Sequence, residues 1–252
     1  MANTLKEKLV RGEIAVGSFV YVPSAKLTEI VGWLGFDFVV IDMEHVPVDT
    51  ALAEDMVRAA EHSGVTPIIR VTHNTPHLIL RALDIGAQAI HVPEINTAEE
   101  AELAAKSARY GPAGHGGLAG VRAAKYGFHE PLPEYVARAN EENMVIAHIE
   151  NYRAVDNLDA LLAVDGIDIY YVGPEDLSNS LGIPGRSKDP KVVELVEYAI
   201  RRIADAGKVA GCIAADVPTA RRYCELGARY IASHAIKFMA QASRQFLEEV
   251  RA

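Results

Sequence analysis

The chain has 252 residues, of which 50% are hydrophobic and 23% charged, as expected for a globular rather than a disordered protein. Its formal net charge of −9 argues against a nucleic-acid-binding protein, which usually carries a basic surface. A (β/α)8 barrel needs roughly 250 residues as one unit, so we expect a single domain over residues 1–252.

The two cysteines, Cys212 and Cys224, are too few for a disulfide framework or a cysteine metal site. We expect both to be small hydrophobic residues in a reducing compartment. Residues 1–11 are polar and do not resemble a signal peptide, and no apolar run approaches the ~20 residues that span a bilayer. These features predict a cytoplasmic protein without a membrane partner.

Short apolar runs alternate with helical patterns along the whole chain. The runs are continuously apolar, as in Phe38-Val39-Val40-Ile41, which is typical of parallel strands buried on both faces. In chain order, the expected strands are Ile14–Val20, Asp37–Asp42, Pro67–Val71, Ala89–Val92, Met144–Glu150, Asp168–Val172, Lys208–Ala214 and Tyr230–Ser233. Strand–helix units in series without a linker predict an α/β fold, a closed (β/α)8 TIM barrel. An open doubly wound sheet is the alternative.

The segments between these runs carry helix signals. Thr97-Ala-Glu-Glu is a capping-box pattern, which predicts a helix from there to about Tyr110. Gly35, Gly86 and Gly227 stand where a helix should end and the next strand begin. Glycine readily adopts the left-handed conformation that ends a helix, so these positions support the alternation.

A glycine-rich segment, Gly111–Phe128, interrupts the rhythm after the fourth strand–helix unit. Long loops in compact domains are usually functional or disordered. Its glycines could bind phosphate, but no strand-to-helix phosphate motif frames them. We expect either a mobile or intersubunit flap of an active site, or a permissive surface loop.

Ionisable residues gather where several expected strands end, and the active site of a TIM barrel lies at that end. In chain order they are Asp42, Glu44, His45, Arg70, His73, His91, Glu94, His148, Glu150, Glu175, Asp176 and His234. Acids, histidines and an arginine should therefore converge on one rim of the barrel.

Glu150 and Asp176 form the best candidate metal pair. They follow neighbouring strands, and two carboxylates with water and substrate oxygens commonly hold Mg²⁺ or a similar ion. Alternatively, Asp176 could cap the turn that begins at Leu177.

His45 is the candidate general base, because imidazole titrates near neutrality and Asp42 is close enough to orient it. Arg70 would place a permanent cation where negative oxygen develops. Alternatively, Arg70 could pair with Glu44 as part of the scaffold.

Other features narrow the chemistry. His91 and His148 lie inside strands, so we expect them to be hydrogen-bonded residues that line the barrel. The last two strands lack the glycine-rich turns that often bind phosphate in this fold, which disfavours a phosphorylated substrate. No lysine ends a strand, which weakens a Schiff-base mechanism, although Lys237 and Lys125 keep it open.

These motifs, in this order, resemble the HpcH/HpaI aldolase family of metal-dependent (class II) pyruvate aldolases. The matching stretches are Gly35–His45, Ile69–Val71, Leu83–Ala87, Val92-Pro93, His148–Glu150 and Val172–Ser178. The combination of Ile-Asp-x-Glu-His with Gly-Pro-x-Asp-Leu-Ser is specific. The last two strand–helix units match less clearly.

The resemblance implies reversible cleavage of a 4-hydroxy-2-oxo acid to pyruvate, or a related 2-oxo acid, and an aldehyde through a metal-stabilised enolate. It assigns a divalent metal to Glu150 and Asp176, with Mg²⁺ or Mn²⁺ expected and Co²⁺ or Zn²⁺ as alternatives. The proton transfer would belong to His45 paired with Asp42. Arg70 would steady the enolate oxygen.

The resemblance also implies substrate contacts and an assembly. Backbone amides at the start of a helix would receive the 2-oxo acid carboxylate. The implied substrate-binding residues are Arg70, Gly173, Pro174, Glu175 and Asp176. Asp84 would act across a subunit boundary in a homo-oligomer, often a hexamer, with the C-terminal helix 235–249 exchanged between neighbours.

Some positions depart from the family pattern. His115 and Gly116 stand in the long loop where an arginine is usual, with Arg122 further along. Glu94 replaces a neutral residue, and His234 ends the last strand. These positions would line the mouth of the site, so the sequence leaves the aldehyde open. The alternative functions are decarboxylation of a 2-oxo diacid, or another enolate reaction, and a non-catalytic barrel that binds a 2-oxo acid.

Overall fold

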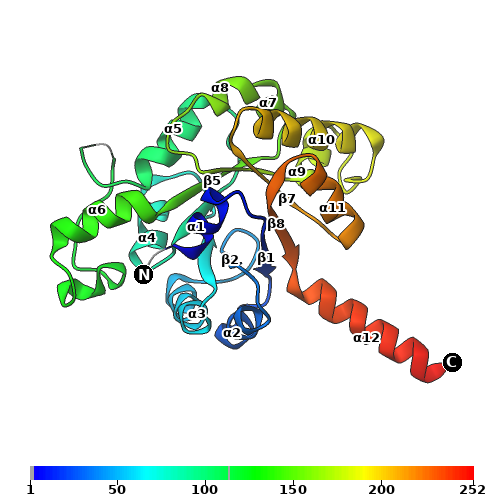
Figure 1. Ribbon diagram of the computed structural model, residues 1–252, viewed down its shortest axis with the longest axis horizontal. Helices are drawn as coiled ribbons and strands as arrows, with labels where there is room; N and C mark the ends of the chain where they lie inside the picture. Colours follow the sequence, from blue (N-terminus) through cyan, green and yellow to red (C-terminus); the bar gives the residue numbers. More distant parts are fainter. Residues whose placement is uncertain (1–2, 113) are drawn as a thin grey trace.

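The computed structural model describes residues 3–112 and 114–252; residues 1, 2 and 113 lie outside the described part. Parallel strands close into a barrel in chain order, and β8 pairs with β1 (Figure 1). The strands are β1 (Ala15–Val20), β2 (Phe38–Asp42), β3 (Thr66–Arg70), β4 (Ala89–Val92), β5 (Met144–Ile149), β6 (Ile169–Val172), β7 (Val209–Ile213) and β8 (Ala228–His234). The predicted (β/α)8 barrel is confirmed, and the open doubly wound sheet is wrong.

Helices follow the strands and, apart from α1 and α12, cover the outside of the barrel (Figure 1). They are α1 (Thr4–Val10), α2 (Ala25–Trp33), α3 (Thr50–Ser63), α4 (Pro76–Asp84), α5 (Ala98–Ser107), η1 (Arg122–Gly127), α6 (Leu132–Glu142), α7 (Tyr152–Asp156), α8 (Leu158–Leu162), α9 (Pro174–Ser180), α10 (Pro190–Asp205), α11 (Val217–Glu225) and α12 (Ala235–Arg251). Helix α1 precedes β1 and packs Leu5 and Leu9 against side chains inside the barrel.

The local helix signals agree with the structure, with one boundary difference. The Thr97 side chain accepts from the Glu100 N–H, and Glu100 accepts from the Thr97 N–H, so the capping box is present. Helix α5 ends at Ser107 rather than near Tyr110, because the Tyr110 N–H leaves the helix and donates to Asn140. The backbone at Gly86 is left-handed, with φ of 103°, as predicted for a helix end.

Aromatic rings fill the inside of the barrel. Alternate side chains of each strand point inward, and this inner cluster includes Phe19, Phe38 and Tyr230. A Cβ on Gly17 would lie 2.2 Å from the Phe38 ring, and a Cβ on Gly211 would lie 2.9 Å from the Tyr230 ring. These two glycines therefore provide the space in which the large rings stack.

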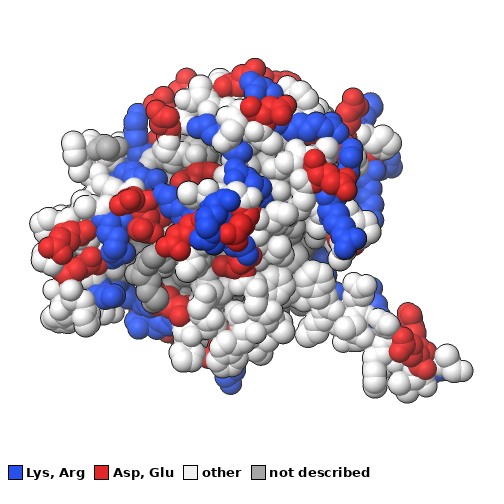
Figure 2. Space-filling model, viewed as in Figure 1, with Lys and Arg blue, Asp and Glu red and all other residues white. Residues whose placement is uncertain are grey.

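Helix α12 stands away from the barrel (Figure 1). None of its residues is buried, and Phe238, Met239 and Phe246 are exposed. In Figure 2 much of this helix presents uncharged surface, with acidic atoms near its far end. Within residues 3–112 and 114–252, no helix is long and apolar enough to cross a membrane.

The described part of the long loop is anchored to neighbouring helices. Arg122 forms an ion pair with Glu61 of α3 and donates to the Ile85 carbonyl at the end of α4. Helices α3 and α4 run from the rim back towards the opposite end of the barrel, so these anchors lie near the beginnings of the strands. Within this chain the loop is therefore held away from the chain's own rim.

Candidate active site at the barrel rim

Strand pairing brings the predicted polar residues together at the rim. Asp42 is the register partner of Arg70, and Arg70 is the register partner of His91. Glu150 directly follows β5. Asp42, Arg70 and Glu150 are all buried, although charged residues are rarely buried unless they are paired or functional.

Arg70 is held in an ionic clamp. Its Nε donates to Asp42 Oδ1 at 2.9 Å, its Nη2 donates to Asp42 Oδ2 at 2.6 Å, and its Nη1 lies 3.1 Å from Glu44 Oε2. The guanidinium also lies 5.0 Å over the Phe19 ring. Burial acts to lower the pKa of Arg70, but Asp42 and Glu44 outweigh it and raise that pKa. Since a guanidinium has five N–H donors, some remain for a substrate oxygen.

The expected pairing of the Asp42 carboxylate with the His45 imidazole is replaced by a different contact. Asp42 accepts from the backbone N–H groups of Glu44, at 3.0 Å, and of His45, at 3.3 Å. The imidazole itself is 58% exposed, and its Nε2 lies 3.8 Å from Glu44 Oε2. Arg70 occupies both Asp42 oxygens, so Asp42 positions His45 through the backbone and Glu44 is the acid beside the ring.

Glu150 and Asp176 interact through their charges. Asp176 is exposed as a residue, but partial desolvation of its carboxyl raises the pKa, and the negative charge of Glu150 raises it further. Burial also acts to raise the pKa of Glu150, but His148 and the Glu94 N–H outweigh it and lower that pKa. A Cβ on Gly173 would lie 3.2 Å from Glu150 Oε2, so glycine there lets the turn after β6 approach Glu150 closely.

This acid pair suits a divalent cation. In the described part of the chain, no Lys or Arg forms an ion pair with Glu150 or Asp176, and the charge of Arg70 acts on both carboxyls only from a distance. Nor do the described residues include three or more His, Cys, Asp or Glu grouped so that they could hold a metal ion. Mg²⁺ commonly takes one or two carboxylates and completes its shell with water and substrate oxygens, which fits two acids at an open rim.

The predicted carboxylate-binding amides lie at the start of α9. Gly173 is the N-cap and has no side chain to accept from the first turn. Pro174 follows at the first helical position, so the amides of Glu175 and Asp176 come next. Unpaired N–H groups at a helix start favour an anion, which agrees with the predicted role.

The sequence predicts only a barrel-lining role for His91 and His148 and predicts no role for Tyr230. The structure joins all three in one hydrogen-bonded series that ends on Glu150. The spacing of two between His148 and Glu150 was the available signal, because residues two apart on a strand share a face. No sequence pattern near Tyr230 indicates that its hydroxyl would join this series.

Asp84 does not join the rim of this chain. It is the last residue of α4. Burial raises the pKa of its carboxyl, and Arg81 opposes this rise. Its negative charge helps to raise the pKa values of Tyr110 and Tyr135. Since α4 runs away from the rim, its end lies towards the other end of the barrel. Any role for Asp84 in catalysis therefore needs a second chain.

The residues that depart from the family pattern lie in three settings. Glu94 has a left-handed backbone with φ of 57°, and its N–H donates to Glu150 Oε1 at 2.8 Å. His234 is buried, and its ring centroid lies 4.5 Å from that of Tyr21. Burial lowers the pKa of His234 to about 4. His115 donates through its backbone to Lys106 and makes no rim contact among the described hydrogen bonds.

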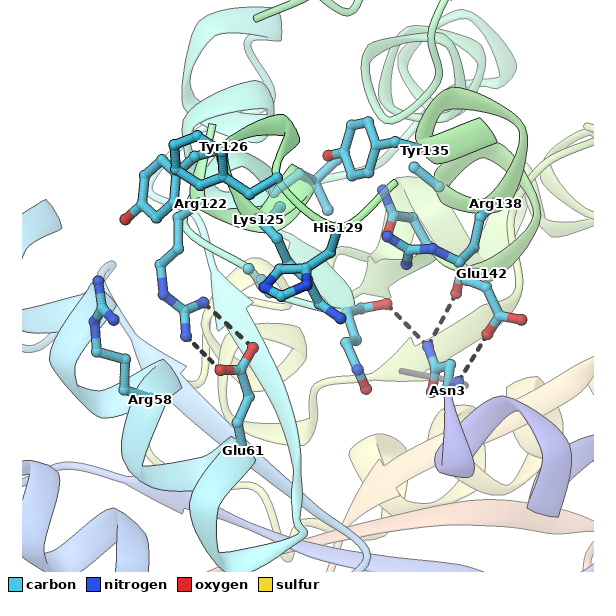
Figure 3. Close-up of a pocket in the computed structure, with 18 residues that line it drawn as sticks. Asn3, Arg58, Glu61, Arg122, Lys125, Tyr126, His129, Tyr135, Arg138 and Glu142 are labelled. Carbon is cyan, nitrogen blue, oxygen red and sulfur yellow. Dashed lines mark hydrogen bonds and ion pairs between the residues drawn. The ribbon is translucent and has the colours of Figure 1, made fainter. Parts of the chain in front are cut away.

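A hollow of about 330 Å³ lies near the beginnings of β4 and β5 (Figure 3). Arg122 and Lys125 of η1 and Arg138 of α6 line it, together with Glu61, which is ion-paired with Arg122. TIM-barrel active sites lie at the ends of the strands, so this hollow is separate from the rim site.

The comparisons with known proteins identify the family. The sequence model described as HpcH/HpaI aldolase/citrate lyase matches residues 16–236. The chain belongs to the HpcH/HpaI aldolase/citrate lyase family. The predicted family is thereby confirmed.

Individual members of the HpcH/HpaI family are similar over nearly the whole chain. A hydroxypyruvate/pyruvate aldolase of Roseovarius nubinhibens is 35% identical over 99% of this chain and 97% of its own length. A 2-keto-3-deoxy-L-rhamnonate aldolase of Klebsiella pneumoniae is 39% identical over 92% of this chain and 86% of its own length. The crystal structure of a family protein from Burkholderia cenocepacia gives a TM-score of 0.94 at 34% identity, covering 99% of this chain and 100% of that chain. The predicted enzyme class, an aldehyde-lyase, is confirmed, and the class II character of the family supports a divalent metal.

Proposed function

We propose that this HpcH/HpaI enzyme cleaves a 4-hydroxy-2-oxo acid reversibly to pyruvate, or a related 2-oxo acid, and an aldehyde at the barrel rim. The observation that carries the proposal is the repelling Glu150–Asp176 pair, without a Lys or Arg partner among the described residues, on the same rim as the Arg70 clamp. The activities named for the Roseovarius and Klebsiella relatives support a 2-oxo acid as the substrate.

Glu150 and Asp176 would hold the divalent ion. Their carboxylate oxygens suit Mg²⁺ or Mn²⁺ best, although Co²⁺ or Zn²⁺ could also serve. When bound, the ion supplies Lewis-acid stabilisation for negative charge on the substrate oxygens.

The residues of the chain would then orient the substrate and move protons. The N–H groups of Glu175 and Asp176 would bind the 2-oxo acid carboxylate, and the free donors of Arg70 would steady the developing enolate oxygen. The exposed His45 imidazole would take the proton of the 4-hydroxyl, directly or through a water. Glu44, 3.8 Å from that ring, would stabilise its protonated form.

We infer that the active unit is a homo-oligomer, and family resemblance favours a hexamer. Helix α12 has no buried residue and exposes Phe238, Met239 and Phe246, which a neighbouring copy would cover. Asp84, remote from the rim of its own chain, would act in a neighbour's site. The free Cys212 and Cys224 support the expected reducing cytoplasm.

Exchange of the C3 protons of pyruvate in D₂O tests this function. We expect the metal-loaded protein to catalyse exchange, measured by ¹H NMR, and a chelator to stop it. Absence of exchange would reject enolate chemistry and favour a binding protein. Release of carbon dioxide from a 2-oxo diacid, without an aldehyde from 4-hydroxy-2-oxo acids, would assign a decarboxylase instead.

A further inference from the structure

A hydrogen-bonded series crosses the inside of the barrel and ends on Glu150. The Tyr230 hydroxyl lies 2.7 Å from His91 Nε2, His91 Nδ1 lies 2.6 Å from His148 Nε2, and His148 Nδ1 lies 2.9 Å from Glu150 Oε2. All four residues are buried. Tyr230 lies on β8, His91 on β4 and His148 on β5, with Glu150 directly after β5, so folding of the barrel is needed to assemble the series.

The chemistry of the groups fixes the direction of donation. A neutral imidazole has one N–H and one bare nitrogen, and an ionised carboxylate can only accept. His148 must therefore donate to Glu150 from Nδ1, which leaves its Nε2 to accept from His91 Nδ1. His91 Nε2 then accepts from the Tyr230 hydroxyl, and every donor has an acceptor while both rings stay neutral.

The reverse direction is disfavoured by burial. It would need a protonated His148 inside the barrel, with the Tyr230 hydroxyl left without an acceptor in the series. Burial holds the pKa of His91 well below its usual range and that of Tyr230 well above its own, so neither of these two side chains ionises near neutrality. The neutral arrangement therefore satisfies more groups at lower cost.

The far end of the series is closed. The Tyr230 ring is buried and stacks on Phe38, with ring centroids 4.0 Å apart and an interplanar angle of 12°. A proton that entered there would have no exit to water, so the series is suited to holding a group in place rather than to conducting protons.

The near end completes the support of Glu150. Its Oε2 accepts from His148 and its Oε1 accepts from the Glu94 N–H at 2.8 Å. Each carboxylate oxygen thus has one fixed donor and a lone pair to spare. This restricts rotation of the carboxylate before any ligand arrives.

We propose that Tyr230, His91 and His148 are positioning residues that hold the Glu150 carboxylate ready for the divalent ion. This inference rests on the proposed metal site. Donors that orient a ligating carboxylate typically contribute 10- to 100-fold to metal affinity. The series is buried and reaches the rim site through Glu150, so its effect should appear in metal binding.

Neutron diffraction from metal-free crystals grown in D₂O tests the direction of donation. We expect deuterium on Nδ1 and none on Nε2 of both His91 and His148, and deuterium on the Tyr230 oxygen. Deuterium on Nε2 of either ring would overturn the proposed series. This measurement uses the wild-type protein, so it does not depend on a variant that folds.

Mn²⁺ titration by calorimetry, without substrate, tests the effect on the ion. We expect His148→Phe to raise the Kd for Mn²⁺ about 10- to 100-fold, and Tyr230→Phe to raise it by less. His148→Asn, whose amide can replace Nδ1–H, should restore part of the loss. Tyr171→Phe removes a hydroxyl from another buried ring beside His148 and should leave the Kd unchanged.

The outcomes separate this inference from the proposed function. If Glu150→Gln loses Mn²⁺ binding while His148→Phe and Tyr230→Phe keep the wild-type Kd, the positioning role is wrong and the metal site stands. If Glu150→Gln binds Mn²⁺ like the wild type, the metal site itself is wrong. A Kd that changes equally in Tyr171→Phe and Tyr230→Phe would show a general packing effect and also overturn the positioning role.

Discussion

The β2–β3 side and the β5–β6 side of the rim both bury carboxylates, but they differ in what balances the charge. On the β2–β3 side, Asp42 and Glu44 share the Arg70 guanidinium at 2.6–3.1 Å. On the β5–β6 side, Glu150 is supported by neutral donors, and the pKa of Asp176 is raised by burial and by Glu150.

This difference in charge balance suits the two sides of the rim to different roles. A closed ion pair gives a fixed cation and a rigid framework, since both partners are buried and bidentate. Two acids without a Lys or Arg partner, among the described residues, attract a cation from solution. The β2–β3 side therefore provides a fixed cation of its own, whereas in the proposed function the β5–β6 side takes its cation from solution.

The largest effect should come from removing a charge on the β5–β6 side. Glu150→Gln or Asp176→Asn should lower metal-dependent aldolase activity at least about 10³-fold, because the ion contributes several kcal/mol to the transition state. Circular dichroism should show an intact fold. Glu99→Gln, an exposed acid on α5, serves as the control and should keep activity. Full activity after chelation would contradict the metal assignment.

A smaller effect should follow from removing the base near the β2–β3 side. His45→Ala should lower kcat for aldol cleavage by roughly 10²- to 10⁴-fold, the usual contribution of a general base. The Kd for Mn²⁺ should stay unchanged, because His45 is not among the metal-holding residues. His62→Ala, an exposed histidine on α3, is the matched control. Normal cleavage by His45→Ala would remove this residue from the mechanism.

Breaking the closed ion pair should mainly affect stability. Asp42→Asn should lower the free energy of unfolding by roughly 3–5 kcal/mol, because it leaves Arg70 buried without its bidentate partner. Urea denaturation at fixed protein concentration would measure this. Glu44→Gln should cost less, since the Glu44 side chain is partly exposed. Equal stabilities of Asp42→Asn and wild type would show that the clamp is not a framework.

The smallest effect on metal binding and stability should come from replacing Glu94. Glu94→Gly keeps the N–H that supports Glu150 and removes a side chain from a left-handed backbone. We expect an unchanged Kd for Mn²⁺ and a rise of up to about 1 kcal/mol in the free energy of unfolding. Loss of Mn²⁺ affinity in this variant would mean that the side chain, rather than the amide, supports the site.

The fold could be predicted because its signals are local. Continuous apolar runs such as Phe38–Ile41 mark buried parallel strands, and glycines such as Gly86 mark helix ends. Closure of the barrel then brings all strand ends to one rim, so Asp42, Arg70 and Glu150 could be placed together without knowing their contacts.

Contacts between strands could not be predicted in the same way. Because Asp42 and His45 are close in sequence, the sequence favours a contact between their side chains. Strand register instead places the Asp42 carboxylate beside Arg70. Tyr230 meets His91 across 139 positions of the chain, and no periodicity encodes that meeting. Such pairings depend on register and on ring orientation inside the closed barrel.

The stacked rings inside the barrel also set a limit on substrate depth. Phe19 lies against the rim residue Arg70, and it and the rings packed against it fill the inside of the barrel, so a bound molecule cannot extend inwards. In the proposed reaction, a longer aldehyde would have to extend outwards, towards whatever surrounds the mouth of the barrel. We therefore expect the outer loops, rather than the inside of the barrel, to set the length of the aldehyde that is accepted.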